Sequence, residues 1–200
     1  MDTTENTLSL PEQKKRIKME SILRNSKHLF EKNGFHETTI SALCKGVMIS
    51  KSTFFNYFGS KEKIIELIIE EDVREFGEHI DNLLSDPEAD PVSVIRDMFA
   101  FLVNGSTTYP NITSVFYSFA MNDTALDSRY KQLFTDYFEI EYKVIRNAQG
   151  KKAINDVYSA ELIAQMFLGC ILSNILRYPR NGLADRMFAS IDELIEALLV

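Results

Sequence analysis

The chain has 200 residues, of which 45% are hydrophobic and 26% are charged, and its formal net charge is −7. These proportions are typical of a folded globular protein and exclude both a disordered chain and one dominated by membrane spans. Eight Gly and five Pro are too few for the closely spaced turns of an all-β sandwich or barrel, so we expect an all-α fold. Two cysteines without metal-binding spacing and an N-terminus without a signal-peptide pattern indicate a cytoplasmic location and no membrane association.

Three helices are predicted in the first 60 residues. Apolar residues recur at helical spacing from about Pro11 to Asn33, where Gly34 ends the helix. Two short helices follow at about 39–47 and 51–57, each preceded by a hydroxyl side chain that can cap free backbone N–H groups. This pattern predicts a helix-turn-helix, and the alternative is a helical hairpin with a polar outer face.

Six more helices are predicted in the rest of the chain. Asp90-Pro91 provides a cap followed by a proline in the first helical turn, and segments rich in Pro, Gly or Asn separate the other helices. The six helices cover about residues 61–84, 91–108, 110–121, 124–149, 157–177 and 184–199. The sequence therefore predicts about nine helices in three parts: a flexible tail at 1–11, a helix-turn-helix domain at 12–60 and a larger helical domain at 61–200.

Charge is distributed unevenly along the chain. Residues 1–63 contain 11 Lys or Arg and 7 Asp or Glu, a net charge of +4, whereas residues 64–200 have a net charge of −11. Such an asymmetry is typical of a protein in which one part binds a polyanion and the other part binds a different partner. The alternative is chance clustering of charged residues on two solvated surfaces. The helix-turn-helix pattern lies inside the basic part and favours nucleic acid.

Several short motifs occur together in this basic part. They are Leu29-Phe30, Gly34-Phe35, Thr38-Thr39-Ile40, the run from Ser50 to Phe58, and Ser60-Lys61-Glu62. In this order and without gaps they resemble the N-terminal domain of TetR-family transcriptional repressors over about residues 12–70. The resemblance implies a dimeric regulator that binds double-stranded, near-palindromic operator DNA and is released by a small molecule.

The resemblance also implies which residues contact DNA. Thr39 would meet the DNA backbone, and Tyr57 and Lys61 would hold phosphates. The residues in or beside the major groove would be Ser50, Lys51, Ser52, Thr53, Phe55 and Asn56. Met48 stands where the family usually has a glycine in the turn, so either the turn is reshaped or Met48 adopts a positive φ.

Aromatic residues are concentrated between Phe99 and Phe138, with polar residues among them. Most of these rings have the spacing of an ordinary helical core, but apolar walls with a few polar groups are also the composition of a ligand pocket. We predict a pocket for a largely apolar small molecule, lined by Asn104, Tyr109, Phe116, Tyr117, Asn122, Phe134 and Tyr137.

The sequence contains no motif with a known catalytic or cofactor-binding mechanism. It lacks G-x-S-x-G, H-E-x-x-H, a P-loop and G-x-G-x-x-G, and its three histidines lack the spacing of a helical metal site. We therefore expect a protein that is not an enzyme and that uses no cofactor or metal. The alternative is an α-helical small-molecule-binding protein or enzyme whose basic N-terminal bundle does not read DNA.

The predicted helices 157–177 and 184–199 are expected to form a homodimer. Small and apolar residues share one side of the first of these helices: Leu162, Met166, Gly169, Cys170 and Ser173. The second has a broad apolar face: Met187, Ile191, Leu194, Ile195 and Leu198. The alternative is that both helices only close the core of a monomer.

Overall fold

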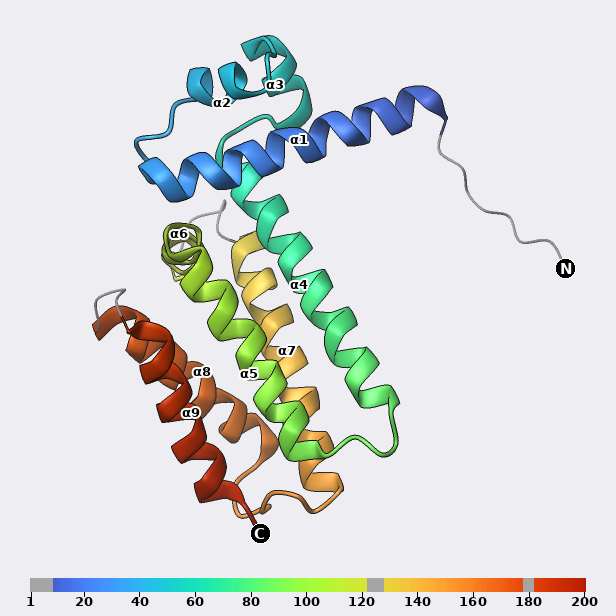
Figure 1. Ribbon diagram of the computed structural model, residues 1–200, viewed down its shortest axis with the longest axis vertical. Coiled ribbons are helices and arrows are strands. Elements are labelled where there is room, and N and C mark those ends of the chain that lie inside the picture. Colours follow the sequence, from blue (N-terminus) through green and yellow to red (C-terminus); the bar gives the residue numbers. More distant parts are fainter. Residues whose placement is uncertain (1–8, 122–127, 178–181) are drawn as a thin grey trace, which may run out of the picture. The chain divides into compact units, whose positions relative to one another are not determined.

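The computed structural model describes residues 9–121, 128–177 and 182–200, and within them it has nine α-helices and no β-strand (Figure 1). The helices are α1 (Leu10–Asn33), α2 (Ile40–Gly46), α3 (Lys51–Phe58), α4 (Glu62–Ser85), α5 (Pro91–Thr108), α6 (Pro110–Ala120), α7 (Ser128–Gly150), α8 (Ala160–Arg177) and α9 (Leu183–Leu198). The predicted all-α fold is confirmed. The chain divides into two compact units, Met1–Ile68 and Ile69–Val200, and the division falls within α4.

In the unit Met1–Ile68, α2 and α3 lie on the same side of α1 (Figure 1). Hydroxyl caps set where both short helices begin: the backbone N–H of Ala42 donates to Thr39 Oγ1 at 3.2 Å, and that of Thr53 donates to Ser50 Oγ at 3.0 Å. A small apolar core holds the helices together. Its fully buried side chains are Ile22, Phe30, Leu43, Phe54, Ile64 and Ile65.

The turn between α2 and α3 contains a residue in the left-handed region. Met48 has a φ of +52°, and its side chain is 92% exposed. The turn is closed by the backbone N–H of Ile49, which donates to the carbonyl of Cys44 at 3.1 Å. Of the two alternatives that the sequence left open at Met48, the positive φ is confirmed. Position 46 requires a glycine for a different reason. The Cβ of any other residue there would lie 2.5 Å from Oδ1 of Asn25.

Replacing Met48 by glycine is expected to raise the free energy of unfolding by about 1 kcal/mol, because glycine adopts a positive φ without the Cβ strain of methionine. The solvent-exposed side chain contributes little packing to lose. Urea denaturation of the variant and the parent measures the change. Met121→Gly is a matched control, since Met121 is also exposed but has a helical φ of −88°; it is expected to gain nothing, and an equal gain in both variants would contradict the strain.

In the unit Ile69–Val200, α5 contacts α7 and α9, and α8 contacts the same two helices, while α6 packs against α5 and α7. The core is aromatic at its centre, where the rings of Phe99 and Phe167 lie 4.3 Å apart. On the surface, Arg96 of α5 forms ion pairs with Asp192 and Glu196 of α9. This packing leaves α6 and the first half of α7 as neighbours on one part of the unit.

One of the predicted helix starts differs from the structure. The prediction that a helix begins at 157 is wrong, because α8 begins at Ala160, where the backbone N–H of Leu162 donates to Ser159 Oγ at 3.2 Å. The preceding segment is held instead by Gln149, whose amide donates to the carbonyls of Asn155 and Tyr158. The predicted start near 124 lies outside the described residues. None of the described helices is both long and apolar enough to cross a membrane.

Candidate functional site

α3 presents a mixed polar and aromatic face on the surface of the unit Met1–Ile68. The exposed side chains at its start and along this face are those of Ser50, Lys51, Ser52, Phe55 and Asn56. Two side chains at its edges are half-buried: Thr53 and Tyr57. On the opposite side, Phe54 and Phe58 are buried with ring centroids 5.6 Å apart. The structure therefore brings the predicted groove residues of α3 together on one exposed face.

The start of α3 and the position of α2 are fixed by side-chain hydrogen bonds. The hydroxyls of Ser50 and Thr53 lie 2.8 Å apart, in addition to the backbone cap at Ser50. From α1, Lys18 Nζ donates to the carbonyl of Val47 at 3.0 Å, and Asn25 Nδ2 donates to that of Leu43 at 3.2 Å. These contacts of Lys18 and Asn25 were not predicted, because helical spacing alone does not show which distant carbonyl a polar side chain reaches.

The charge of this region is entirely positive. Between Thr38 and Lys61 the chain contains no Asp or Glu and three lysines, Lys45, Lys51 and Lys61. The side chains of Lys45 and Lys51 are exposed. Ammonium, hydroxyl and amide groups on a two-turn helix match the phosphates and base edges of a DNA major groove. The face can therefore bind a nucleic acid both by charge and by hydrogen bonding.

Lys61 occupies a different position from the other two lysines. Its Nζ donates to three carbonyls, those of Phe35 at 2.7 Å, Thr38 at 3.1 Å and His36 at 3.3 Å. The ammonium also lies 4.3 Å from the centroid of the Phe35 ring. Lys61 thus ties the residue before α4 to the loop that leads into α2. Its predicted contact with a phosphate stays a prediction, and the carbonyls account for its three N–H donors.

A second group of predicted site residues meets in the unit Ile69–Val200. Phe116 and Tyr137 have ring centroids 6.0 Å apart, and Tyr117 and Phe134 are 6.2 Å apart. Phe76 of α4, which the sequence argument did not include, lies 5.7 Å from Tyr137. We call Phe116, Tyr117, Phe134, Tyr137 and Phe76 the aromatic cluster.

Three further residues were predicted to line the pocket: Asn104, Tyr109 and Asn122. The side chain of Asn104 is exposed, and Tyr109 is half-buried at the junction of α5 and α6. Asn122 lies outside the described residues. Lining of a pocket by these three residues therefore stays a prediction.

A carboxyl group is buried beside the aromatic cluster. Glu141 of α7 is only 2% exposed, and its Oε2 has no hydrogen-bond partner among the described residues. Burial raises the pKa of this carboxyl to about 8. Burial, and next the negative charge of Glu141, raise the pKa of Tyr117. Glu141 was not predicted, although an acidic residue four positions after Tyr137 on the apolar side of a helix is a signal that could have found it.

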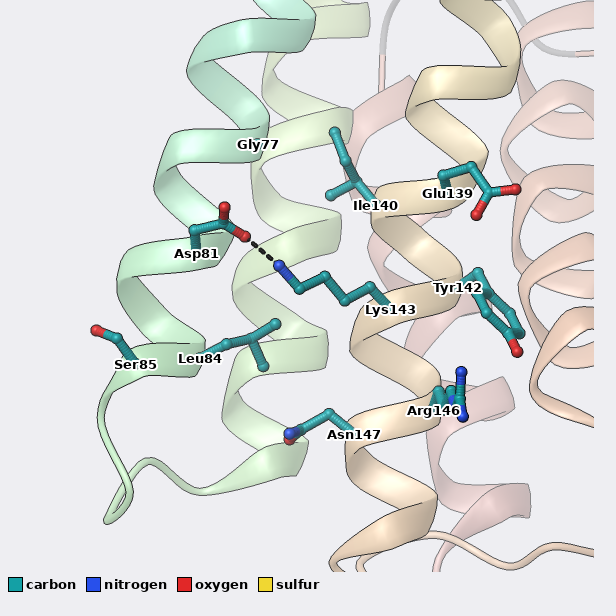
Figure 2. A pocket seen from close by; sticks show the side chains of 10 residues that line it. All are labelled: Gly77, Asp81, Leu84, Ser85, Glu139, Ile140, Tyr142, Lys143, Arg146 and Asn147. Carbon is teal, nitrogen blue, oxygen red and sulfur yellow. Dashed lines mark hydrogen bonds and ion pairs between the residues drawn. The ribbon is translucent and has the colours of Figure 1, made fainter.

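A surface groove of about 970 Å³ lies between the second half of α4 and α7. Figure 2 shows Lys143 reaching from α7 to Asp81 of α4, while Glu139 and Tyr142 point away from α4. The lining residues are Gly77, Asp81, Leu84, Ser85, Glu139, Ile140, Tyr142, Lys143, Arg146 and Asn147. None of the residues predicted to bind a ligand lines this groove.

The sequence of the basic part is similar to known DNA-binding proteins. The family model described as bacterial regulatory proteins of the tetR family matches residues 22–68. The transcriptional regulator EthR of Mycolicibacterium smegmatis is 31% identical over 90 residues, which is 45% of this chain and 42% of EthR. UidR of Escherichia coli K12 is 41% identical over 51 residues, 26% of each chain. The matched region thus spans less than half the length of these relatives.

Longer matches have lower identity. The nucleoid occlusion factor SlmA of Photorhabdus laumondii is 26% identical over 175 residues, 84% of this chain and 85% of SlmA. Among solved structures, FadR of Thermus thermophilus in complex with lauroyl-CoA has a TM-score of 0.66 at 23% identity, covering 91% of this chain and 95% of FadR. FadR of Bacillus subtilis in complex with stearoyl-CoA has a TM-score of 0.72 at 16% identity, covering 90% and 97%. The structural matches show a shared fold over nearly the whole chain.

Proposed function

From the premise that this chain belongs to the TetR family of bacterial regulatory proteins, we propose that it is a cytoplasmic, homodimeric transcriptional repressor that a small molecule releases from DNA. The observation that carries the proposal is the exposed face of α3, where Lys51, Ser52, Phe55 and Asn56 lie together in a region without acidic residues. In a helix-turn-helix protein this is the helix that enters the major groove. The proposal includes no catalytic reaction.

Two kinds of DNA contact are proposed for this face. Lys51 holds a phosphate and gives affinity for every sequence, whereas the amide of Asn56 hydrogen-bonds to a base edge and gives preference for particular base pairs. Thr39, at the start of α2, and Tyr57, at the edge of α3, are proposed to position the protein on the DNA backbone. Phe55 is 48% exposed, and its ring is proposed to contact an apolar base edge such as a thymine methyl group.

Substitutions on α3 are expected to separate these two kinds of contact. With a duplex selected from a random pool, Lys51→Ala is expected to weaken binding to all sequences and to reduce the salt slope of log K by about 1. Asn56→Ala is expected to leave the slope unchanged and to relax the preference at particular base pairs. Fluorescence anisotropy at several salt concentrations measures both effects. Lys131→Ala, an exposed lysine of α7, is the control, and unchanged binding in both α3 variants would refute α3 as the reading helix.

The homodimer is proposed to form mainly through α8. On its outer face the side chain of Leu162 is 43% exposed and that of Met166 is 38% exposed. Gly169 and Ser173 follow on the same face and are also exposed, and their small size would let a partner helix approach closely. The apolar face of α9, which was also predicted to form the interface, packs within the protomer instead. Met187, Ile191, Ile195 and Leu198 are buried in the core of their own protomer, and Leu194 is half-buried.

Control by a small molecule is proposed to act through α4. This helix is continuous from Glu62 to Ser85 and belongs to both compact units, since the division lies between Ile68 and Ile69. A ligand bound at the aromatic cluster would change DNA affinity if it favoured one position of α4 over another. A coupling free energy of ~1–3 kcal/mol would then release the DNA by roughly 5- to 150-fold.

The long match to a nucleoid occlusion factor favours a second candidate function, DNA binding without control of a particular gene. The two functions differ in the number of sites on the chromosome. Mapping of the bound sites in cells that express the protein distinguishes them. A few sites next to promoters would support the repressor, and many sites spread over the chromosome would support the second candidate.

A further inference from the structure

The aromatic cluster and the buried carboxyl of Glu141 lie on elements that converge within one unit. Phe134, Tyr137 and Glu141 follow each other along one side of α7 at intervals of three and four residues, and Phe116 and Tyr117 come from α6. The rings of Phe116 and Tyr117 are 5.3 Å apart, and each is paired with a ring of α7. The result is a group of packed aromatic rings with the buried carboxyl of Glu141 beside it.

Buried acidic groups ordinarily have hydrogen-bond partners for both oxygens, and among the described residues one oxygen of this carboxyl has none. No residue of the described chain donates a hydrogen bond to Glu141 Oε2, and Glu141 forms none of the ion pairs found in that part of the chain. An unpaired buried carboxylate costs several kcal/mol, so such a group stays protonated until a positive partner arrives.

The surrounding groups make this region attractive to a cation and unattractive to an anion. The pKa of Tyr117 on α6 is raised by burial and by Glu141, and that of Tyr137 by burial, by Asp72 of α4 and by Tyr117. Both tyrosines therefore stay neutral at physiological pH and present the negative faces of their rings, which attract cations. The negative charge of Asp72, which raises the pKa of Tyr137, opposes a bound phosphate or carboxylate.

We propose that Glu141, buried beside Tyr117 and Tyr137 without a partner for Oε2, is the recognition group for the protonated amine of an apolar or aromatic effector. The amine would donate to the carboxylate, and the aromatic cluster would bind the apolar body of the molecule. The inference rests on the proposed function, since it names the chemical class of the molecule that controls DNA binding. It also separates this chain from the two FadR proteins, which are found with lauroyl-CoA and stearoyl-CoA, both anionic molecules.

Matched pairs of small molecules test the amine. The probes are tryptamine with tryptophol, 1-naphthylmethylamine with 1-naphthylmethanol, and octylamine with 1-octanol, and lauroyl-CoA serves as an anionic probe. Calorimetry at pH 7 measures their affinities for the full chain, for Glu141→Gln and for Glu139→Gln, an exposed glutamate on the same helix. At least one amine is expected to bind at least tenfold more tightly than its alcohol, and Glu141→Gln is expected to remove this preference while Glu139→Gln keeps it.

Proton release provides a second readout that a merely structural role of Glu141 would not give. A carboxyl with a pKa of about 8 is about nine-tenths protonated at pH 7, so an ion pair with the amine releases about 0.9 proton per ligand. Calorimetry in phosphate and in Tris buffer measures this number, because the two buffers take up protons with different enthalpies. Glu141→Gln is expected to release none.

Three results with the amines would each overturn the proposal: no binding of any amine, equal binding of amine and alcohol, or amine binding unchanged in Glu141→Gln. Tighter binding of lauroyl-CoA than of every amine would also overturn it. The amine test does not depend on the proposed DNA binding, because binding of the amines is measured without DNA. A protein that binds amines through Glu141 but fails to bind any selected duplex would refute the proposed repressor and leave the amine site standing.

Discussion

Glu141→Gln is expected to stabilise the protein by up to about 5 kcal/mol at pH 9 and to have almost no effect on stability at pH 4.5. The pKa of Glu141 is raised from 4.5 to about 8 in the folded state by burial. Between these values the folded protein keeps a proton that the unfolded chain has lost, so the free energy of unfolding falls by about 1.4 kcal/mol per pH unit as pH rises. Above pH 8 the loss is complete, and the neutral glutamine avoids it.

Urea denaturation followed by helical circular dichroism at pH 4.5, 7 and 9 measures this effect. The difference between Glu141→Gln and the parent is expected to grow steadily with pH, whereas Glu139→Gln, on the exposed side of α7, is expected to show no such trend. A difference that is the same at all three pH values would show that folding does not raise the pKa of this carboxyl. Since glutamine is nearly the same shape as glutamic acid, a change in packing is a minor contribution.

The double variant Leu162→Glu/Met166→Glu is expected to be a folded monomer with an operator affinity reduced by roughly 10²- to 10⁴-fold. Both side chains are exposed on α8, so the substitutions leave the core of the protomer intact and place charges where the partner helix is proposed to lie. A dimer binds two half-sites about 34 Å apart, and the second half-site adds avidity that a monomer lacks.

Analytical ultracentrifugation at micromolar concentration measures the mass, with 22.9 kDa expected for the monomer. Met121→Glu is the matched control, because Met121 is more exposed than either residue, at 61%, and does not lie on α8. This control is expected to remain a dimer and to bind DNA like the parent. A parent protein that sediments as a monomer, or a double variant that sediments as a dimer, would refute α8 as the interface.

The positions of the helices could be predicted because their ends are encoded locally. Thr39, Ser50 and Asp90 each accept a hydrogen bond from a backbone N–H three residues later, as their positions in the sequence predict. The wrong start of α8 has the same origin, since the cap is Ser159 and the apolar Val157 lies outside the helix. Local chemistry thus determined most boundaries.

The site residues depended on distant contacts and were harder to predict. The exposed face of α3 follows from helical spacing, because its buried rings, Phe54 and Phe58, identify the opposite face. The three carbonyls that Lys61 reaches lie 23 to 26 residues away in sequence, and no spacing rule indicates them. Burial of Glu141 depends likewise on how α6 and α7 pack.

The hydrogen bonds that hold α2 and the turn before α3 make the N-terminal unit suitable for transfer to another protein of the same fold. Lys18, Asn25 and Lys61 all donate to carbonyls that lie, like the donors, within Met1–Ile68. A chimera joined between Ile68 and Ile69, inside the continuous helix α4, would cut none of these bonds. The protein that receives this unit would have to continue α4 in the same helical phase. It would also need apolar residues at the positions of Ile69 and Phe76, which are buried in this protein. If α3 reads DNA as proposed, the DNA specificity would be encoded in a transferable block, and a different helical body could place it under the control of another chemical signal.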